Sequence, residues 1–378
     1  MKIKICQFTI AHLLEDERIY HKECKSLLRE YDVTLVSTSD FSGMREGINV
    51  VGLGKPEGFI NRLKRVFTIL PVLKRQNCAV YHFHDPELIV TGYLLKKFYG
   101  KKVVYDVHEH YTNKMKSKHF GSLNFMKGLI IGIWRRMEIW MANQLDLIVT
   151  ADTITAKQFR ADKTISIGNF PTLEFVQDSV PKNVVAEEDF RVVYLGTIHE
   201  QRGLRKCVEA IEKVKYPGIK LHIIGSCRFP ELTELFESSP RVVFHGRIPW
   251  EVLNKELAKC HVGLILLQPV SAFTYIPGEN IVKLFEYAGM GIPYLMSDFK
   301  LLHMFTEEFG GGLTVDPTDT DAIARKIEFL YENPDVYRRL SEEGIRFVQQ
   351  QFNWDMQEQK LLTAYRGILN EKQNINLK

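Results

Sequence analysis

Residues 191–214 read RVVYLGTIHEQRGLRKCVEAIEKV, which predicts a strand, a short loop and a helix in succession. The apolar run ends on Gly196, and the helical pattern begins at Leu204. A glycine at the end of a strand lets a ligand approach the backbone, and Arg202 just before the helix can bind an anion with two hydrogen bonds. Taken alone, the stretch is weak evidence for such a site, because a turn that carries a solvated arginine has the same pattern.

The same alternation of apolar runs and amphipathic helical patterns extends over both halves of the chain. The predicted strands are Ile3–Thr9, Val33–Ser37, Val80–His84, Val103–Val107, Leu145–Thr150, Val192–Leu195, Leu221–Ile224, Val242–Phe244, Val262–Leu267, Tyr294–Met296 and Leu313–Val315. This rhythm is typical of parallel βαβ units. We therefore expect an α/β protein with two Rossmann-like, doubly wound parallel-sheet domains that face a central cleft.

A polar stretch without periodicity separates the two halves. We expect an N-terminal domain over residues 1–170, a linker over 171–190 and a C-terminal domain over 191–350. The last segment, 351–378, reads as a helix that packs back on the first domain.

Composition narrows the class of protein. The chain has 378 residues, of which 45% are hydrophobic, and a net charge of +4, so it can bury substantial cores and gives no electrostatic sign of nucleic-acid binding. Its six cysteines are scattered without metal-binding spacing, which predicts reduced thiols. Neither a signal peptide nor a membrane span is indicated, so we expect a cytoplasmic protein.

A second motif lies at residues 277–287, PGENIVKLFEY. If the helix begins at Pro277, Glu279, Lys283 and Glu286 share one face. The helix N-terminus and Lys283 would then attract a phosphate, and a carboxylate one turn further could accept ribose hydroxyls. The alternative is a surface helix with a Glu–Lys pair. Together with the Gly196–Arg202 motif, the arrangement favours a nucleotide-sugar pocket.

On these motifs the chain resembles retaining glycosyltransferases of the GT-B fold, family 4, over nearly its whole length. The resemblance implies that Arg202 and Lys283 hold the donor diphosphate and that Glu286 binds the ribose. It also implies that loops around the base come from 223–226 and 242–248. The donor-binding residues expected from it are Gly196, Thr197, Arg202, Gly225, Arg247, Ile248, Lys283 and Glu286.

In the N-terminal half, the resemblance points to strand ends that face the transferred sugar and the acceptor. It implies that His108 lies near the sugar, with Asp85 and Glu279 as further catalytic candidates. Glu109 and the loop residues His12, Asp16 and Arg18 are expected on the acceptor side. Two alternatives stay open, because Asp85 before Pro86 is also a helix start and Asp16 is also a helix cap.

The chain departs from the family pattern at two positions. The place where many members carry the first of two glutamates is Gly278, with Glu279 displaced by one residue. Thr197 stands where many members carry a basic residue. A formal Asp-x-Asp at Asp319 and Asp321 opens a predicted helix, so we expect capping there and neither a metal ion nor a cofactor in the reaction.

The resemblance implies transfer from a nucleotide diphosphate sugar, with uridine diphosphate sugars first, to a saccharide or lipid-linked saccharide in bacterial surface polysaccharide synthesis. The alternatives are a nucleotide-sugar epimerase of the same architecture and a non-catalytic polysaccharide-assembly protein. Residues 61–67, 74–75, 114–118 and 125–136 interleave basic with large apolar side chains. Such segments fit either a peripheral contact with an anionic membrane or ordinary core helices.

Overall fold

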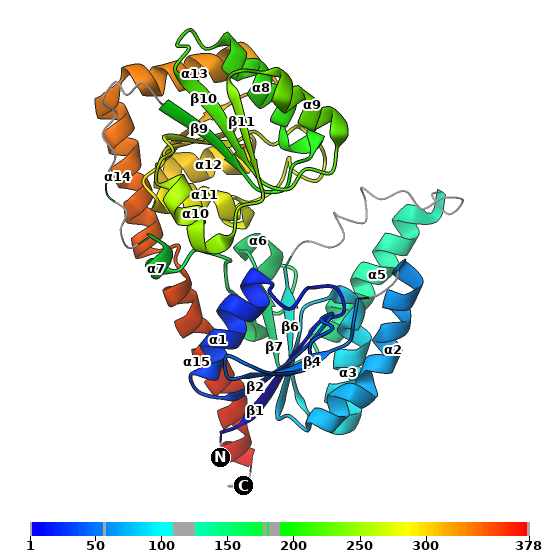
Figure 1. Ribbon diagram of the computed structural model, residues 1–378. Coiled ribbons are helices and arrows are strands. Elements are labelled where there is room, and N and C mark those ends of the chain that lie inside the picture. Colours follow the sequence, from blue (N-terminus) through cyan, green and yellow to red (C-terminus); the bar gives the residue numbers. More distant parts are fainter. Residues whose placement is uncertain (1, 56–57, 109–124, 177–179, 181–189, 376–378) are drawn as a thin grey trace. The chain divides into compact units, whose positions relative to one another are not determined.

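The computed structural model describes residues 2–55, 58–108, 125–176, 180 and 190–375. The chain divides into two compact units, Met1–Asn169 with Asp355–Lys378, and Phe170–Trp354. Each unit contains one sheet with its own helices (Figure 1). Pro171–Val176, which the sequence analysis assigned to the linker, fall in the second unit, where Phe175 and Val176 join its core.

The first unit contains an eight-stranded sheet in the order β3-β4-β2-β1-β5-β6-β7-β8, parallel except for the β3–β4 pair. Its strands are β1 (Lys4–Phe8), β2 (Asp32–Ser37), β3 (Gly43–Arg45), β4 (Ile48–Gly52), β5 (Val80–Phe83), β6 (Lys102–Val107), β7 (Leu147–Thr150) and β8 (Thr164–Ser166). The β3–β4 hairpin and β8 were not predicted, because they are short and not fully buried.

The helices of the first unit cover both faces of this sheet. They are the π-helix η1 (Glu17–Cys24), α1 (Lys25–Leu28), α2 (Gly58–Gln76), the 3₁₀ turn η2 (Pro86–Leu88), α3 (Ile89–Tyr99), α5 (Lys127–Ala142), α6 (Thr153–Ala156), the 3₁₀ turn η4 (Ala161–Lys163) and α15 (Trp354–Ile375). Figure 1 shows α2, α3 and α5 on one side of the sheet, with α1 and α15 on the other. This agrees with right-handed crossover connections. From β1 to β2 the chain moves toward one edge of the sheet, and from β5 to β8 it moves toward the other, so the connecting helices lie on opposite faces.

The second unit contains a six-stranded, fully parallel sheet in the order β11-β10-β9-β12-β13-β14. Its strands are β9 (Phe190–Leu195), β10 (Ile219–Ile224), β11 (Val242–Gly246), β12 (Val262–Ile265), β13 (Tyr294–Ser297) and β14 (Gly312–Val315). Its helical segments are α7 (Leu173–Val176), η5 (Glu200–Arg202), α8 (Leu204–Lys213), α9 (Pro230–Ser238), α10 (Trp250–Leu257), η6 (Gly278–Asn280), α11 (Val282–Gly289), α12 (Lys300–Phe309), α13 (Thr320–Glu332) and α14 (Pro334–Gln350).

One predicted helix boundary is wrong, and it bears on the site. The helix expected from Pro277 begins at Val282, because residues 278–280 form a separate 3₁₀ turn and Ile281 has non-helical φ and ψ angles of −101° and 82°. Glu279 is therefore not on the same helix face as Lys283 and Glu286. The capping interpretation of Asp319 is confirmed, because its Oδ1 accepts a hydrogen bond from the Ala322 N–H at 2.9 Å.

Candidate functional site

The predicted donor residues of the second unit meet at the carboxyl end of β9. Gly196 follows this strand with a φ of +123°, and its N–H donates to the Ile224 carbonyl at 2.9 Å. The neighbouring strand β10 ends on Gly225, where a Cβ would lie 1.9 Å from the Gly196 carbonyl oxygen. The two strand ends therefore approach each other through bare backbone, as a site for a ligand against the main chain requires.

Lys283 projects from the first turn of α11 toward the same strand end. Its Nζ lies 3.8 Å from the centre of the Tyr194 ring, and a Cβ placed on Gly196 would lie 3.6 Å from that nitrogen. Burial and the positive charge of Arg202 lower the pKa of Lys283 to about 7. Two cations thus converge beside an apolar ring, an arrangement that an anion would stabilise.

The other predicted donor residues take different environments. Arg202 ends the turn η5 with its guanidinium carbon 4.9 Å from the centre of the Phe273 ring, and Glu286 is buried one turn beyond Lys283. Thr197 is exposed, and its carbonyl oxygen accepts from the Tyr194 hydroxyl at 2.7 Å. Arg247 is exposed after β11, whereas Ile248 packs against the core. Of the predicted donor residues, Gly196, Arg202 and Lys283 therefore lie together at the end of β9.

The structure gives a reason for the displaced glutamate. A Cβ at Gly278 would lie 2.6 Å from Cγ of Phe305, so the ring occupies the space that a side chain at this position would need. Glu279 lies on the neighbouring 3₁₀ turn and is partly buried.

In the first unit, polar side chains gather at the carboxyl ends of β1, β5 and β6, which are adjacent in the sheet. The centre is Asp106, whose Oδ2 lies 2.8 Å from Nε2 of His108 and 3.2 Å from Nδ1 of His84. Burial lowers the pKa of His84 to about 4, so this ring is neutral at neutral pH. His108 keeps 20% of its side chain exposed, whereas Asp106 is fully buried.

A second histidine–aspartate pair lies beside the first. Nδ1 of His12 is 2.9 Å from Oδ2 of Asp16, and the ring centres of His12 and His108 are 5.1 Å apart. Although burial opposes protonation, Asp16 and Asp85 raise the pKa of His12. Asp16 also caps the π-helix, since its Oδ1 accepts from the backbone N–H groups of Arg18 and Ile19, so the capping alternative holds together with the pairing.

Two of the predicted site residues, Asp85 and Arg18, are buried and form hydrogen bonds with other groups of the first unit. Asp85 is 2% exposed, and its Oδ2 accepts from the Thr9 hydroxyl and the Ile10 N–H, each at 2.7 Å, which ties the β1 and β5 loops together. Arg18 is 4% exposed and donates to both carboxylate oxygens of Asp106 at 2.9 and 3.0 Å. Arg18 thus positions Asp106. Glu109 lies outside the described residues.

Sequence reasoning missed the polar layer beneath this cluster. Ligand atoms of Glu23, His82, His84 and Asp106 lie within 4.8 Å of one another, a grouping that could hold a metal ion. However, Nε of Arg18 already lies 3.0 Å from Glu23 and 2.9 Å from Asp106, so a fixed cation already pairs with both carboxylates of the cluster. Tyr365 on α15 places its hydroxyl 2.8 Å from Nδ1 of His82. No spacing in the sequence signals these distant contacts.

The comparisons with known proteins agree with this organisation. Residues 189–333 match the family model described as Glycosyl transferases group 1. EpsD from Bacillus subtilis (strain 168), itself only inferred to be a glycosyltransferase, is 25% identical over 294 residues, which cover 70% of each chain.

Solved structures extend the likeness to nearly the whole chain. A sucrose-phosphate synthase from Thermosynechococcus elongatus has a TM-score of 0.75 at 15% identity, covering 98% of this chain and 100% of its own. Alr3699/HepE of Anabaena, in complex with UDP-glucose, has a TM-score of 0.72 at 14% identity, covering 97% and 100%. These likenesses show that the fold is GT-B. The family match over the second unit and this fold together support the identification of the chain as a glycosyltransferase enzyme.

Proposed function

We propose that the protein is a retaining glycosyltransferase of family 4 that moves a sugar from a UDP-sugar to a saccharide acceptor. The observation that carries the proposal is the convergence of Lys283 and Arg202 on the bare backbone at Gly196. Such a site suits a diphosphate, because two cations and exposed main-chain groups can neutralise the departing anion. The bound UDP-glucose in Alr3699/HepE makes uridine the first nucleotide to test.

The first unit supplies polar groups of the kind that a sugar needs. The exposed edges of His108 and His12 can donate to or accept from hydroxyl groups. Asp106, backed by Arg18, holds the ring of His108, and Asp16 holds the ring of His12. In the proposed reaction, the bond between the anomeric carbon and the donor phosphate oxygen breaks, and the acceptor oxygen forms a bond on the same face. The departing phosphate takes the acceptor's proton, so the chain needs neither a nucleophile nor a metal ion.

We place this reaction in the cytoplasm of a bacterium, on a lipid-linked saccharide that enters a surface polysaccharide. The acceptor and the location rest on the family resemblance and on the basic, apolar character of the first unit. In the described residues, we find no helix of the length and hydrophobicity that crossing a membrane requires.

Calorimetric titration with uridine, guanosine and adenosine diphosphates tests the donor half of the proposal. We expect selective binding of the uridine compound and its loss in Lys283→Ala. The matched control is Lys300→Ala, which removes an exposed lysine of the same unit. Absence of binding to all three nucleotides would contradict the proposal and favour a non-catalytic assembly protein.

Product analysis separates transfer from epimerisation. With a UDP-sugar alone, an epimerase converts the sugar, whereas the proposed transferase leaves it unchanged apart from slow hydrolysis. Adding acceptor should release UDP, and NMR of the product should show the anomeric configuration of the donor. Addition of EDTA should leave the rate unchanged if the reaction proceeds without a metal ion.

A further inference from the structure

The helices on one face of the first unit expose an unusual amount of apolar surface. Of the twenty large apolar side chains that are exposed in the described part of the chain, nine lie on α2, α3, α5 or the two residues before α5. Scattered exposed apolar residues are normal in folded proteins, but a concentration on adjoining helices marks an interaction surface. The three helices lie together on the same side of the sheet (Figure 1).

On α5 the exposed residues form a stripe. Phe125 is 83% exposed, Leu129 and Ile133 are each 59% exposed, and Trp140 is 54% exposed. These positions recur at helical spacing, whereas Ile131 and Ala142 on the opposite face are buried against the unit. The helix therefore has apolar side chains on two opposite faces, one packed against the unit and one largely exposed. Within the exposed stripe, the centre of the Trp140 ring lies 5.4 Å from that of Tyr93 on α3.

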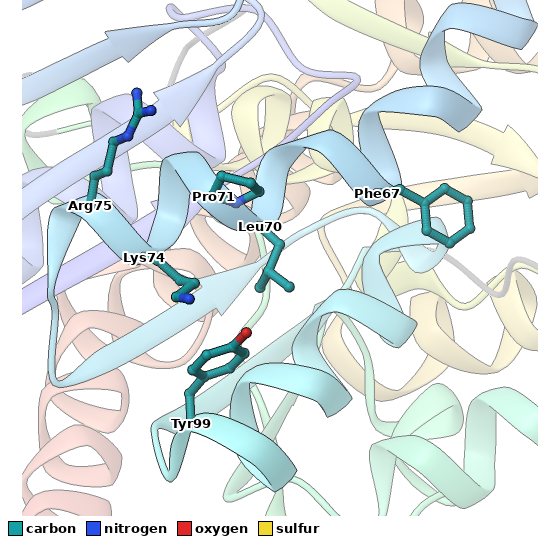
Figure 2. Close-up of a pocket in the computed structure, with 6 residues that line it drawn as sticks. All are labelled: Phe67, Leu70, Pro71, Lys74, Arg75 and Tyr99. Carbon is teal, nitrogen blue, oxygen red and sulfur yellow. The ribbon is translucent and has the colours of Figure 1, made fainter.

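A shallow groove continues this surface between α2 and α3. It has a volume of about 420 Å³ and is lined by Phe67, Leu70, Pro71, Lys74, Arg75 and Tyr99. Figure 2 shows Leu70 and Lys74 pointing from α2 toward Tyr99 at the end of α3, and the Lys74 ammonium lies 4.6 Å from the centre of that ring. Phe67 is 74% exposed at the other end of the groove.

Charge distinguishes this face from the rest of the molecule. The sequences of α2, α3 and α5 contain ten basic residues and one acidic residue, a surplus of nine positive charges, whereas the whole chain has a surplus of only four. The remainder of the chain is therefore net negative. The acidic residue, Glu138, is buried and accepts from the Tyr105 hydroxyl at 2.7 Å, so it does not offset the exposed cations. Those cations include Lys64, Arg75, Lys97 and Arg136.

We infer that this face, the exposed surface of α2, α3 and α5, binds an anionic lipid bilayer. Cations interleaved with phenylalanine, leucine, isoleucine and tryptophan match the headgroup region, where charges meet lipid phosphates and apolar side chains enter the acyl boundary. A protein partner would need a matching acidic surface, and nothing on this face points to one. The expected membrane contact thus falls on residues 61–75 and 125–136, whereas residues 114–118 lie outside the described part.

This face lies next to the polar cluster of the first unit, so a bilayer bound there would be near the proposed acceptor site. Arg62, near the start of α2, lies 2.9 Å from Glu87 and 3.8 Å from Asp85, the residue that ties the β1 and β5 loops together. The N-terminal end of α2 therefore adjoins the polar cluster of Asp106 and His108. A bilayer on this face would bring a lipid-linked saccharide close to that cluster. This last step rests on the proposed function, whereas bilayer binding itself does not.

Co-sedimentation of the full chain with vesicles tests the electrostatic part. We expect binding to phosphatidylcholine vesicles that contain phosphatidylglycerol and weak binding to pure phosphatidylcholine. Binding to the anionic vesicles should decrease about tenfold as salt rises from roughly 0.05 M to 0.5 M. The double variant Lys64→Glu/Arg136→Glu should lower binding by at least about tenfold. Its control, Lys220→Glu/Lys300→Glu, changes the net charge equally through exposed lysines of the second unit and should bind normally.

A second pair of variants tests the apolar part. Leu129→Ser/Ile133→Ser should weaken binding at low salt, whereas Met304→Ser/Phe329→Ser, which polarises exposed positions of the second unit, should not. Brominated lipids should quench Trp140, and Trp140→Phe should lose that quenching. Circular dichroism checks folding of every variant, and UDP titration without vesicles reports the donor site separately. Equal binding to neutral and anionic vesicles, no binding to either, or self-association that needs no lipid would each overturn the inference.

Discussion

The ammonium group of Lys283 lies 3.8 Å from the centre of the Tyr194 ring, at the end of the strand where Gly196 exposes its backbone. Partial burial and the nearby Arg202 make protonation costly there and lower the pKa of Lys283 to about 7. A diphosphate would offset that cost by supplying the missing negative charge. Binding and protonation of Lys283 are therefore linked.

We predict that affinity for UDP-glucose is fully present below pH 7 and decreases by up to about tenfold per pH unit above it. The sign follows because the unliganded protein loses the proton above its pKa, whereas the complex keeps it. Calorimetry in buffers of different ionisation enthalpy should show uptake approaching one proton per ligand at pH 8. Lys283→Arg should remove the pH dependence, and equal affinity at pH 6 and pH 9 would refute the linkage.

The second prediction concerns His108. Because its ring is held by Asp106 and keeps an exposed edge, His108→Ala should lower kcat by about 10- to 100-fold through lost positioning of the sugar. UDP affinity should not change, because the grouped cations of the donor site lie in the other unit. His303→Ala is the control, since that ring is half exposed on α12. An unchanged kcat would remove His108 from the site.

The buried ion pair beneath the histidines gives a prediction about stability. Arg18→Met should destabilise the first unit by about 3–5 kcal/mol, because Asp106 then remains as a buried charge without its main partner. Adding Asp106→Asn should recover part of that loss. Arg29→Met removes a largely exposed partner of Glu358 and should cost less than about 1 kcal/mol. Chemical denaturation followed by circular dichroism measures all four proteins.

The fourth prediction is that the Phe305 ring excludes a side chain at position 278, and introducing the glutamate that many family members carry there tests it. Gly278→Glu should destabilise the second unit by about 1–3 kcal/mol, since the new side chain collides with Phe305. Phe305→Ala in the same chain should relieve the collision, so the double variant should be more stable than the sum of the two single effects predicts. Simple additivity would show that the ring is not what excludes a side chain at position 278.

Substitutions at Asp319 distinguish a helix-capping role of this residue from a metal-binding role. Asp319→Ala should cost about 1 kcal/mol, because the first turn of α13 loses the acceptor for the Ala322 N–H, and Asp319→Asn should cost less. Neither variant should alter the transfer rate at a temperature where both are folded. A loss of activity that added divalent metal restores would contradict the capping role.

The strands were predictable from the sequence because their signal is local. Each predicted apolar run contains a strand, since a buried strand of a parallel sheet needs apolar side chains on both faces. The short hairpin of β3 and β4 was missed because its residues are partly exposed and carry no such run. The start of α11 was misplaced, since the backbone at Ile281 breaks a pattern that the side chains alone continue.

Two α/β units, the glycine at the end of β9 and the basic residues that meet there were predictable from the order of amino acids, because strand ends and helix starts recur at fixed places in βαβ units. The grouping of the polar residues, in contrast, depends on the folded chain. Arg18 and Asp106 are 88 positions apart, and Tyr365 reaches His82 across 283 positions, so the order of the strands and the docking of α15 create these contacts. Burial then fixes their charges, because the free energy of an ionised group depends on the atoms packed around it and not on its neighbours in sequence.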